Sequence, residues 1–272
     1  MTLHVRVDGA SGERIHPMDR GLLYGDGLFE TVLFRDGTAP LWQRHMARLA
    51  SGCVRLGLPL PDAQALRSRC EEAAGTWPCA ALRITWTRGP GERGYAAPAS
   101  PQPTCVIAAG AAPVVASAAV ECGVKVHLCQ TRLARQPLLA GMKHLNRLEQ
   151  VLARAEWQAA DIAEGLVCDV DGNLISATAA NIFVALGGTL VTPAVDHCGV
   201  AGVVREELLS ALPVTVRPLT LEDLMHAEEL FLTSSIRGAL PVAECDGRRH
   251  VPGTFVRRAQ AHLQRIGVMV AV

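Results

Sequence analysis

Residues 139–156 read LAGMKHLNRLEQVLARAE, in which a short apolar run leads to a lysine and then to a helical pattern. Apolar side chains recur there at intervals of three and four, so we expect a helix over Lys143–Ala160. A lysine in a first turn is disfavoured as a cation by the helix dipole. Together with apolar surroundings, this would lower the pKa of Lys143, as an imine-forming lysine requires. The alternative is an exposed lysine that extends to solvent.

Lysine usage points to the same residue. Only two of the 26 basic residues are lysines, Lys125 and Lys143. Arginine stays protonated, whereas a lysine can lose its proton and form a Schiff base, so such a chain is expected to keep lysine where arginine cannot serve. Lys125 stands between two valines, a pattern typical of a solvated position on a strand. Lys143 is therefore the better candidate for covalent chemistry.

Composition excludes several classes of protein. The chain has 272 residues, 49% of them hydrophobic, which is enough for about two domains. Its 26 basic and 26 acidic residues balance, so we expect no binding of nucleic acid or anionic membranes. The first residues, MTLHVRVDG, lack the basic and apolar regions of a signal peptide, and no apolar run approaches about 20 residues, so we expect a soluble protein. The nine cysteines show no CxxC pair and no zinc-ligand spacing, so we expect a cytoplasmic protein without a metal.

Strand-like and helical stretches alternate along the chain, which predicts a mixed α and β fold. Helices are expected over Trp42–Leu56 and from near Val203. The Ala- and Pro-rich residues 111–119 are expected to link a small N-terminal α/β domain (1–110) to a larger C-terminal α/β domain (120–272) that carries Lys143. The expected strands are Leu3–Val7, Leu28–Phe34, Ala80–Thr87, Thr104–Ala109, Val124–Gln130, Gly165–Val170, Asn181–Leu186, Thr189–Thr192 and Glu229–Leu232.

Residues 199–205 (GVAGVVR) form a glycine-bearing turn that leads into a helix. The backbone N–H groups of Val203 and Val204 could therefore hold a phosphate. No Lys-Ser/Thr pair follows, so the turn is not a P-loop. Thr233, Ser234 and Ser235 follow a strand and could add hydroxyl donors, although such residues are also common in turns.

Residues 87–95 (TRGPGERGY) place two arginines and a tyrosine on a glycine-rich loop. Arg88, Arg93 and Tyr95 suit the binding of a small molecule rich in carboxylates, and an exposed loop is the alternative. Arg20 and Arg237 also stand beside glycines. The nine histidines share no spacing that favours a Ser–His–acid triad, and neither G-x-S-x-G nor G-x-G-x-x-G occurs.

Four blocks, which together span most of the chain, resemble the fold-type IV enzymes that use pyridoxal 5′-phosphate (PLP). This family includes branched-chain and D-amino-acid aminotransferases and aminodeoxychorismate lyases. KHLNRLEQ and the TRG-G-RGY loop make the likeness nearest to the lyases. The resemblance implies a homodimer in which each chain has two α/β domains. PLP would bind at the boundary between the domains and the subunits. The blocks are residues 19–31 (DRGLLYGDGLFET), 87–95, 139–156 and 177–183 (ATAANIF).

The resemblance also implies roles for single residues. Lys143 would carry the imine link to PLP and transfer protons. Arg48 matches the arginine that binds the cofactor phosphate in this family. The backbone of Val203 and Val204 and the hydroxyl of Ser235 match the rest of the phosphate cup.

One position departs from the family pattern. A glutamate that pairs with the protonated pyridine nitrogen usually precedes the segment ending in Asn-hydrophobic-Phe, and Ala177 occupies that position here. The ring is then a weaker electron sink, which affects a transaminase more than a lyase that forms an aromatic product. We expect Thr178, Ser176 or water to solvate the nitrogen. Leu148 also replaces the tyrosine that branched-chain transaminases usually carry five residues after the lysine.

The resemblance therefore implies elimination of pyruvate from 4-amino-4-deoxychorismate to give 4-aminobenzoate. Arg88, Arg93 and Tyr95 would hold the substrate carboxylates. Two alternatives stay open. One is an aminotransferase acting on D- or branched-chain amino acids, and the other is a PLP-binding protein that lost catalysis with its glutamate.

Overall fold

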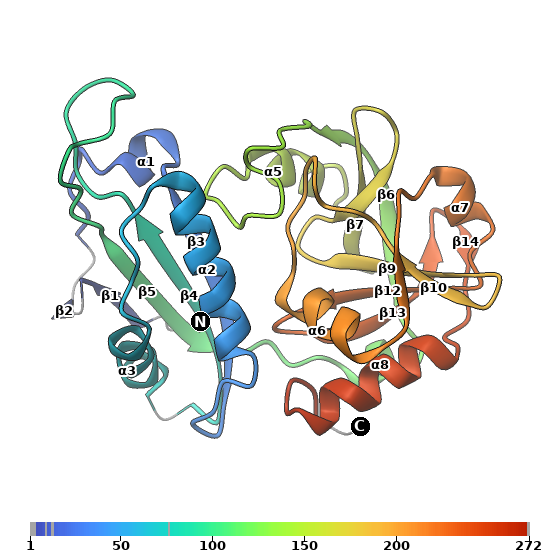
Figure 1. Ribbon diagram of the computed structural model, residues 1–272. Helices are drawn as coiled ribbons and strands as arrows, with labels where there is room; N and C mark the ends of the chain where they lie inside the picture. The colour runs from blue at the N-terminus through green and yellow to red at the C-terminus, as the bar shows by residue number, and fades with distance from the viewer. Residues whose placement is uncertain (1–3, 9, 12–13, 76, 271–272) are drawn as a thin grey trace. The chain divides into compact units, whose positions relative to one another are not determined.

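The computed structural model describes residues 4–8, 10–11, 14–75 and 77–270. Contacts divide the chain into two compact units (Figure 1). Unit 1 comprises Met1–Pro113 and Met142–Asn146, and unit 2 comprises Val114–Gly141 and Arg147–Val272. The chain first passes from unit 1 to unit 2 between Pro113 and Val114, within the expected linker, residues 111–119. No helix of the described residues is long and apolar enough to cross a bilayer.

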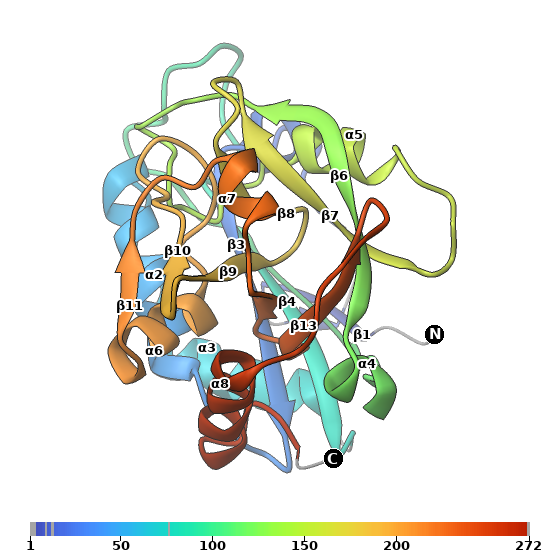
Figure 2. The ribbon, with the colours of Figure 1, turned by 90° about the vertical axis from the view of Figure 1, so that its right-hand side faces the viewer.

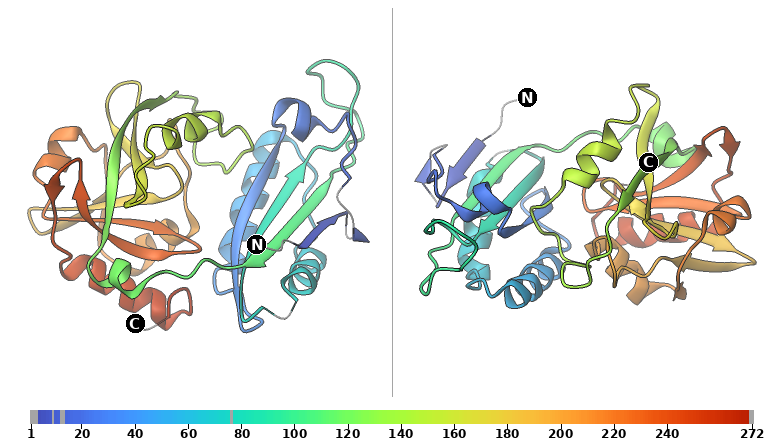
Figure 3. Two further views of the ribbon diagram at one scale, coloured as in Figure 1. Left: turned by 180° about the vertical axis from the view of Figure 1, so that it is seen from behind. Right: turned by 90° about the horizontal axis from the view of Figure 1, so that it is seen from above.

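Unit 1 is a five-stranded antiparallel sheet with α2 and α3 on one face (Figures 1 and 3). The strand order is β2-β1-β5-β4-β3, and β3 pairs with β4 along its whole length. The strands are β1 (His4–Val7), β2 (Ala10–Ser11), β3 (Gly27–Arg35), β4 (Cys79–Thr87) and β5 (Cys105–Ala111). The helices are α1 (Arg20–Tyr24), α2 (Trp42–Leu56) and α3 (Ala63–Ala74).

Helix α2 is amphipathic and packs closely against β3. Its buried residues Trp42, Met46, Leu49 and Cys53 recur at helical spacing. A Cβ added at Gly52 would lie 2.7 Å from a methyl group of the buried Leu28 side chain, which would have to shift. Glycine at this position therefore allows α2 to approach β3 closely.

Unit 2 is built on a mixed nine-stranded sheet that curls into a half-barrel (Figure 2). The strand order is β11-β10-β9-β12-β13-β6-β7-β8, with β14 on β13. The strands are β6 (Val124–Leu133), β7 (Ile162–Asp169), β8 (Leu174–Ala177), β9 (Asn181–Leu186), β10 (Thr189–Thr192), β11 (Val214–Val216), β12 (Glu229–Ser234), β13 (Gly238–Cys245) and β14 (Arg248–Arg249). The helices are α4 (Ser117–Glu121), α5 (Leu148–Arg154), α6 (Val203–Ala211), α7 (Leu221–Met225) and α8 (Thr254–Arg265).

The central strands of unit 2 are buried on both faces, which explains why β9 and β12 read as nearly continuous apolar runs. Phe183 and Phe231 face each other across these strands with their rings stacked 5.0 Å apart. Ala177 is 4% exposed and belongs to a core cluster with Leu166 and Leu174. The methyl group of Ala177 is therefore a core contact.

Most expected elements are confirmed. Helix α2 and strands β9 and β10 have the predicted bounds, and α6 begins at Val203 as expected. Leu3, in the expected strand Leu3–Val7, lies outside the described residues. Helix α3 was not predicted.

The prediction of a helix from Lys143 is wrong. Helix α5 begins only at Leu148 and ends at Arg154. The backbone of the lysine segment pairs with β3 instead: Phe29 N donates to Lys143 O at 2.9 Å, and Leu145 N donates to Gly27 O at 3.0 Å. These bonds group residues 142–146 with unit 1, whereas the lysine was expected in the C-terminal domain. Because α5 begins only at Leu148, Lys143 does not lie in the first turn of a helix, as was expected.

Ala177→Glu should destabilise the protein strongly, because it buries a carboxylate among apolar side chains. We expect urea unfolding of the cofactor-free protein to show a loss of at least about 3 kcal/mol. The matched control is Ala179→Glu, since Ala179 is exposed two residues further along. That variant should stay within about 0.5 kcal/mol of wild type. Equal stability of the two variants would show that the side chain at 177 does not face the core.

Candidate active site

Lys143 is held by its backbone, and its half-buried side chain lies over an aromatic ring of unit 1. The ammonium Nζ is 4.2 Å from the centre of the Phe29 ring. The guanidinium of Arg83 lies over the same ring at 3.9 Å. Arg83 is exposed and therefore accessible to a ligand. The structure thus brings two cations together on one aromatic side chain.

Arg83 was missed in the sequence. It stands on β4 between Leu82 and Ile84, a pattern that also fits an ordinary solvated strand position. The register of β3 and β4 pairs Arg83 with Thr31, two residues from Phe29 and on the same face. This cross-strand placement could have been found only once the pairing of the strands was known.

Arg48 is held by a buried carboxylate on the opposite face of β3. Arg48 Nε donates to Glu30 Oε1 at 2.8 Å, and its Nη2 donates to Oε2 at 2.5 Å. His45, three residues earlier on α2, places Nδ1 2.7 Å from the same Oε2. Glu30 is 1% exposed. A two-point bond of this kind fixes the orientation of the guanidinium as well as its position.

The charges of this cluster favour an ionised glutamate. Burial alone would raise the pKa of Glu30, but the charge and hydrogen bonds of Arg48, with the His45 hydrogen bond, lower the pKa to about 2. Burial lowers the pKa of His45 against the opposing effect of Glu30. Sequence reasoning missed Glu30 and His45. The available signal was a glutamate inside the apolar strand Leu28–Phe34, together with the H-x-x-R spacing on α2.

In unit 2, a glycine turn leads into the first turn of α6. The N-cap is Gly202 in an extended conformation, and no side chain caps it. Asn181 Nδ2 donates to Val200 O at 2.8 Å, and a Cβ at Gly202 would overlap Asn181 Oδ1. Asn181 therefore fixes the turn. The N–H groups of Val203 and Val204, in the first turn, have no acceptor within an α-helix.

A buried hydroxyl lies beside Asn181. Thr233 pairs with Asn181 across β9 and β12, and its Oγ1 has no hydrogen-bond partner among the described residues. Ser235, half-buried, follows two residues later. An unmet buried hydroxyl near helix N-terminal N–H groups is a donor set that fits a phosphate. This part of unit 2 therefore suits the phosphate of a cofactor such as PLP.

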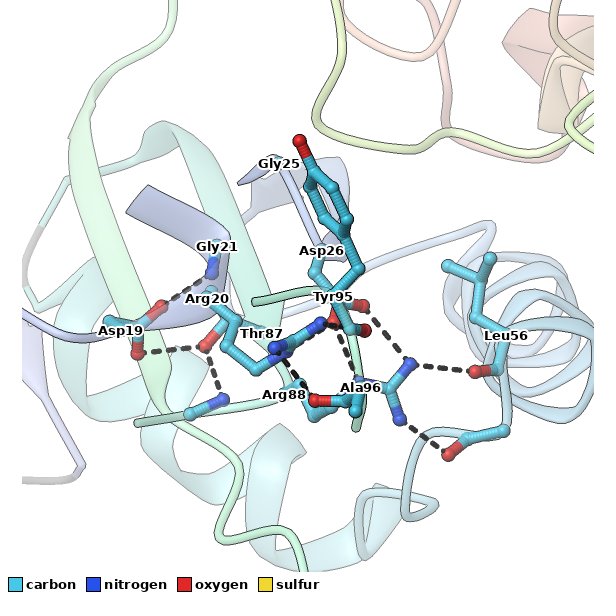
Figure 4. A network of polar contacts seen from close by, with 12 residues as sticks. Asp19, Arg20, Gly21, Gly25, Asp26, Leu56, Thr87, Arg88, Tyr95 and Ala96 are labelled. Carbon is cyan, nitrogen blue, oxygen red and sulfur yellow. Dashed lines mark hydrogen bonds and ion pairs between the residues drawn. The ribbon is translucent and has the colours of Figure 1, made fainter. Parts of the chain in front are cut away.

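Arg88 does not fit the expected role in substrate binding, because the fold uses its donors (Figure 4). It is buried and donates to both carboxylate oxygens of Asp26, at 2.7 and 3.0 Å. It also donates to Leu56 O at 2.7 Å and Gly57 O at 2.8 Å. Arg20 Nε also donates to Asp26 Oδ2, at 2.9 Å, so the two arginines share this carboxylate. Burial alone would raise the pKa of Asp26, but the two arginines lower it.

The rest of that loop is anchored through its backbone. Arg20 donates to the carbonyl oxygens of Gly94, Tyr95 and Ala96. The Tyr95 side chain is 87% exposed and points away from the polar network (Figure 4). Its ring is 5.4 Å from that of Tyr24. Arg93 is also exposed, so Arg93 and Tyr95 stay predictions as substrate-binding residues.

One group of side chains in the described residues has the composition of a metal site. His127, Cys129 and Glu156 place their ligand atoms within 4.8 Å of one another. Glu156, however, accepts from the backbone of Gln130 at 2.7 Å and of Thr131 at 2.8 Å. Burial raises the pKa of Cys129 to about 12. The pairing of β6 with β7 shifts register between Leu128 and Arg132, and we assign this group to holding that irregular part of β6.

The fold and these clusters define a member of a PLP-enzyme family, and comparison with known proteins shows which one. The chain belongs to the class IV aminotransferase family, whose model matches residues 27–245. It is 34% identical to the aminodeoxychorismate lyase of Vibrio harveyi, over 94% of this chain and 98% of that protein.

Two further relatives refine the comparison. The crystal structure of 4-amino-4-deoxychorismate lyase from Pseudomonas aeruginosa is 41% identical and superposes with a TM-score of 0.91, covering 97% of this chain and 100% of that one. A bifunctional aminodeoxychorismate lyase and D-amino acid transaminase of Mycobacterium tuberculosis is 28% identical, over 92% of this chain and 91% of that protein. Lyases therefore stand among the similar proteins in both comparisons.

Glu30→Gln should change how stability depends on pH. The folded pKa of Glu30 is about 2, against 4.5 for a free glutamate. Ionised Glu30 thus stabilises the wild type fully above pH 4.5, and this contribution is lost as the pH falls towards 2. It corresponds to about 3 kcal/mol. Urea unfolding between pH 7 and pH 2 should show a flatter profile for the variant, which is also less stable at pH 7.

Glu71→Gln is the matched control, because Glu71 forms an exposed ion pair with Arg67 on α3. Its pH profile should follow that of the wild type. Parallel profiles for the wild type and Glu30→Gln would contradict the role given to the buried carboxylate.

Proposed function

We propose that this protein is a PLP-dependent 4-amino-4-deoxychorismate lyase, which forms 4-aminobenzoate and pyruvate. The observation that carries the proposal is the placement of Lys143. It lies over Phe29 beside the accessible cation Arg83, in a chain whose lyase relatives align along almost their whole length. An amine that can react covalently next to a cation suits a substrate that carries both an amino group and carboxylates.

Each of the clusters described above has one part in the binding of PLP. When bound, PLP supplies an aldehyde that links to amines and a ring that accepts electrons. Lys143 is the amine that holds the aldehyde. Arg48, kept in orientation by Glu30, binds the phosphate together with the backbone of Val203 and Val204. Ser235 adds a hydroxyl donor to the same phosphate.

Lys143 also moves protons. Once the amino group of the substrate has replaced that of Lys143, the Lys143 amine acts as general base and removes the proton at C4 of the substrate. The C–O bond that joins the substrate ring to the enolpyruvyl group then breaks, and the substrate ring becomes aromatic. The resulting ammonium of Lys143 returns a proton to the departing group, which leaves as pyruvate. Arg83 holds a substrate carboxylate during these steps and keeps C4 within reach of the amine.

An aminotransferase is the second candidate, and the bifunctional relative favours it as a side activity. Both reactions begin with the same link between a substrate amine and the cofactor. Leu148, where branched-chain transaminases usually carry a tyrosine, weighs against transamination as the main reaction. Transfer of an amino group to a keto acid would identify it.

We also propose a cytoplasmic homodimer. Helix α5 exposes an apolar face, with Leu148, Val151 and Leu152 each more than 60% accessible in the single chain. Apolar side chains clustered in this way mark contact surfaces, and a second copy of the chain is the partner that the family resemblance implies. Seven of the nine cysteines are buried as free thiols, which suits a reducing compartment.

Lys143→Ala should abolish the covalent link and at least most of the turnover. Borohydride reduction of the wild-type holoenzyme followed by peptide mass spectrometry should find the cofactor on Lys143. Lys125→Ala is the matched control, because Lys125 is exposed and pairs with Asp161 at 3.0 Å. It should keep both the link and the activity. A fully active Lys143→Ala enzyme would rule out the proposed mechanism.

Arg83→Gln should raise KM for aminodeoxychorismate about 10- to 100-fold, because a charged hydrogen bond to a carboxylate is lost. Steady-state kinetics would measure the change. Arg67→Gln is the control, since Arg67 also lies over aromatic rings of unit 1, those of Phe34 and Trp42. An unchanged KM in Arg83→Gln would exclude Arg83 from substrate binding.

A further inference from the structure

A buried carboxylate in unit 2 gathers two polar side chains from separate turns. Glu164, on β7, is 3% exposed. The Thr178 hydroxyl, just after β8, donates to its Oε1. Arg237 Nη2, from the turn after β12, donates to its Oε2 at 2.5 Å. The backbone of Thr178 is fixed as well, because its N–H donates to Gly165 O at 2.9 Å.

The bond to Glu164 determines what the Thr178 hydroxyl can do for a ligand. A hydroxyl has one proton and two acceptor lone pairs. Because the proton of Thr178 goes to Glu164, its oxygen can serve other groups only as an acceptor. A hydrogen bond to a carboxylate also strengthens the donating oxygen as an acceptor through polarisation. Thr178 is thus prepared to receive a hydrogen bond from a ligand N–H group.

The cluster is continuous with the phosphate-binding part of unit 2. Asn181, three residues after Thr178, holds the turn that begins α6. Arg237 follows Ser235 by two residues in the turn after β12. Arg237 therefore shares its turn with Ser235, and Thr178 lies close along the chain to Asn181, which holds the turn before α6. Ala177 itself faces the core and offers no polar atom there.

We propose that the Thr178 hydroxyl, oriented by Glu164, accepts the hydrogen bond of the PLP ring nitrogen in place of the glutamate usual in this family. The inference rests on the proposed function, since it takes PLP as the cofactor. Glu164 acts through Thr178 and is a positioning residue.

Arg237 determines how strong a hydrogen-bond acceptor the Thr178 hydroxyl is. Its guanidinium offsets the charge of Glu164 and so limits how far Glu164 polarises the Thr178 hydroxyl. Thr178 is therefore a weaker hydrogen-bond acceptor than a carboxylate would be. The ring nitrogen is then less firmly protonated than beside a glutamate. Such a ring is sufficient for an elimination whose product is aromatic, and it disfavours transamination, which depends more on the electron sink.

The test is ¹⁵N NMR of the holoenzyme loaded with PLP labelled at the ring nitrogen, combined with the Kd for PLP. In Thr178→Val the resonance should move towards that of an unprotonated pyridine, and the Kd should rise about 10-fold. Thr178→Ser should keep both wild-type values. Arg237→Gln should move the resonance in the opposite direction, towards the protonated form.

Thr192→Val is the matched control. The Thr192 hydroxyl is also buried in unit 2, where it donates to Ile182 O at 2.8 Å. Its loss should leave the ¹⁵N resonance unchanged. A wild-type resonance and Kd in Thr178→Val, or the same shift in Thr192→Val, would overturn the inference and leave the proposed function standing. A wild-type protein that binds no PLP would overturn both.

Discussion

Backbone pairing with β3 is the constraint on which the proposed site depends. It fixes the backbone of the lysine segment, because Phe29 N donates to Lys143 O and Leu145 N donates to Gly27 O. The same strand supports both candidate cofactor contacts of unit 1, because side chains alternate between its faces. Phe29 lies under the lysine on one face, and Glu30 holds Arg48 on the other. Pairing of β3 with β4 then brings Arg83 to the Phe29 ring.

Three arginines of this chain are each held by a carboxylate, which is buried for Glu30 and Glu164 and half-buried for Asp26. Glu30 holds Arg48, Asp26 holds Arg88, and Glu164 holds Arg237. Burying such charges costs desolvation energy, which the ion pairs and further hydrogen bonds offset. The result is that each guanidinium has one orientation. For Arg48 that orientation serves a ligand in our account, whereas for Arg88 it serves the fold.

The sequence predicted elements well where a repeating pattern reports burial directly. Helix α2 and strands β9 and β10 have such patterns, and the glycine turn correctly marked the start of α6. The segment of Lys143 was identified but its conformation was not, because strand pairing overrode local helical periodicity. Arg88 was misassigned and Glu30 and Glu164 were missed for a related reason. Their partners lie far along the chain or are backbone carbonyls, and residue type does not reveal which donors a fold has used.

Lyase activity is tested most directly by supplying the holoenzyme with aminodeoxychorismate, generated in place by its synthase, with no keto acid present. Pyruvate and 4-aminobenzoate are then followed together. A lyase releases both products in equal amounts, since elimination needs no amino acceptor. Absence of both products from enzyme that carries the reducible imine, with amino transfer appearing only after a keto acid is added, would contradict the proposed lyase function and identify an aminotransferase.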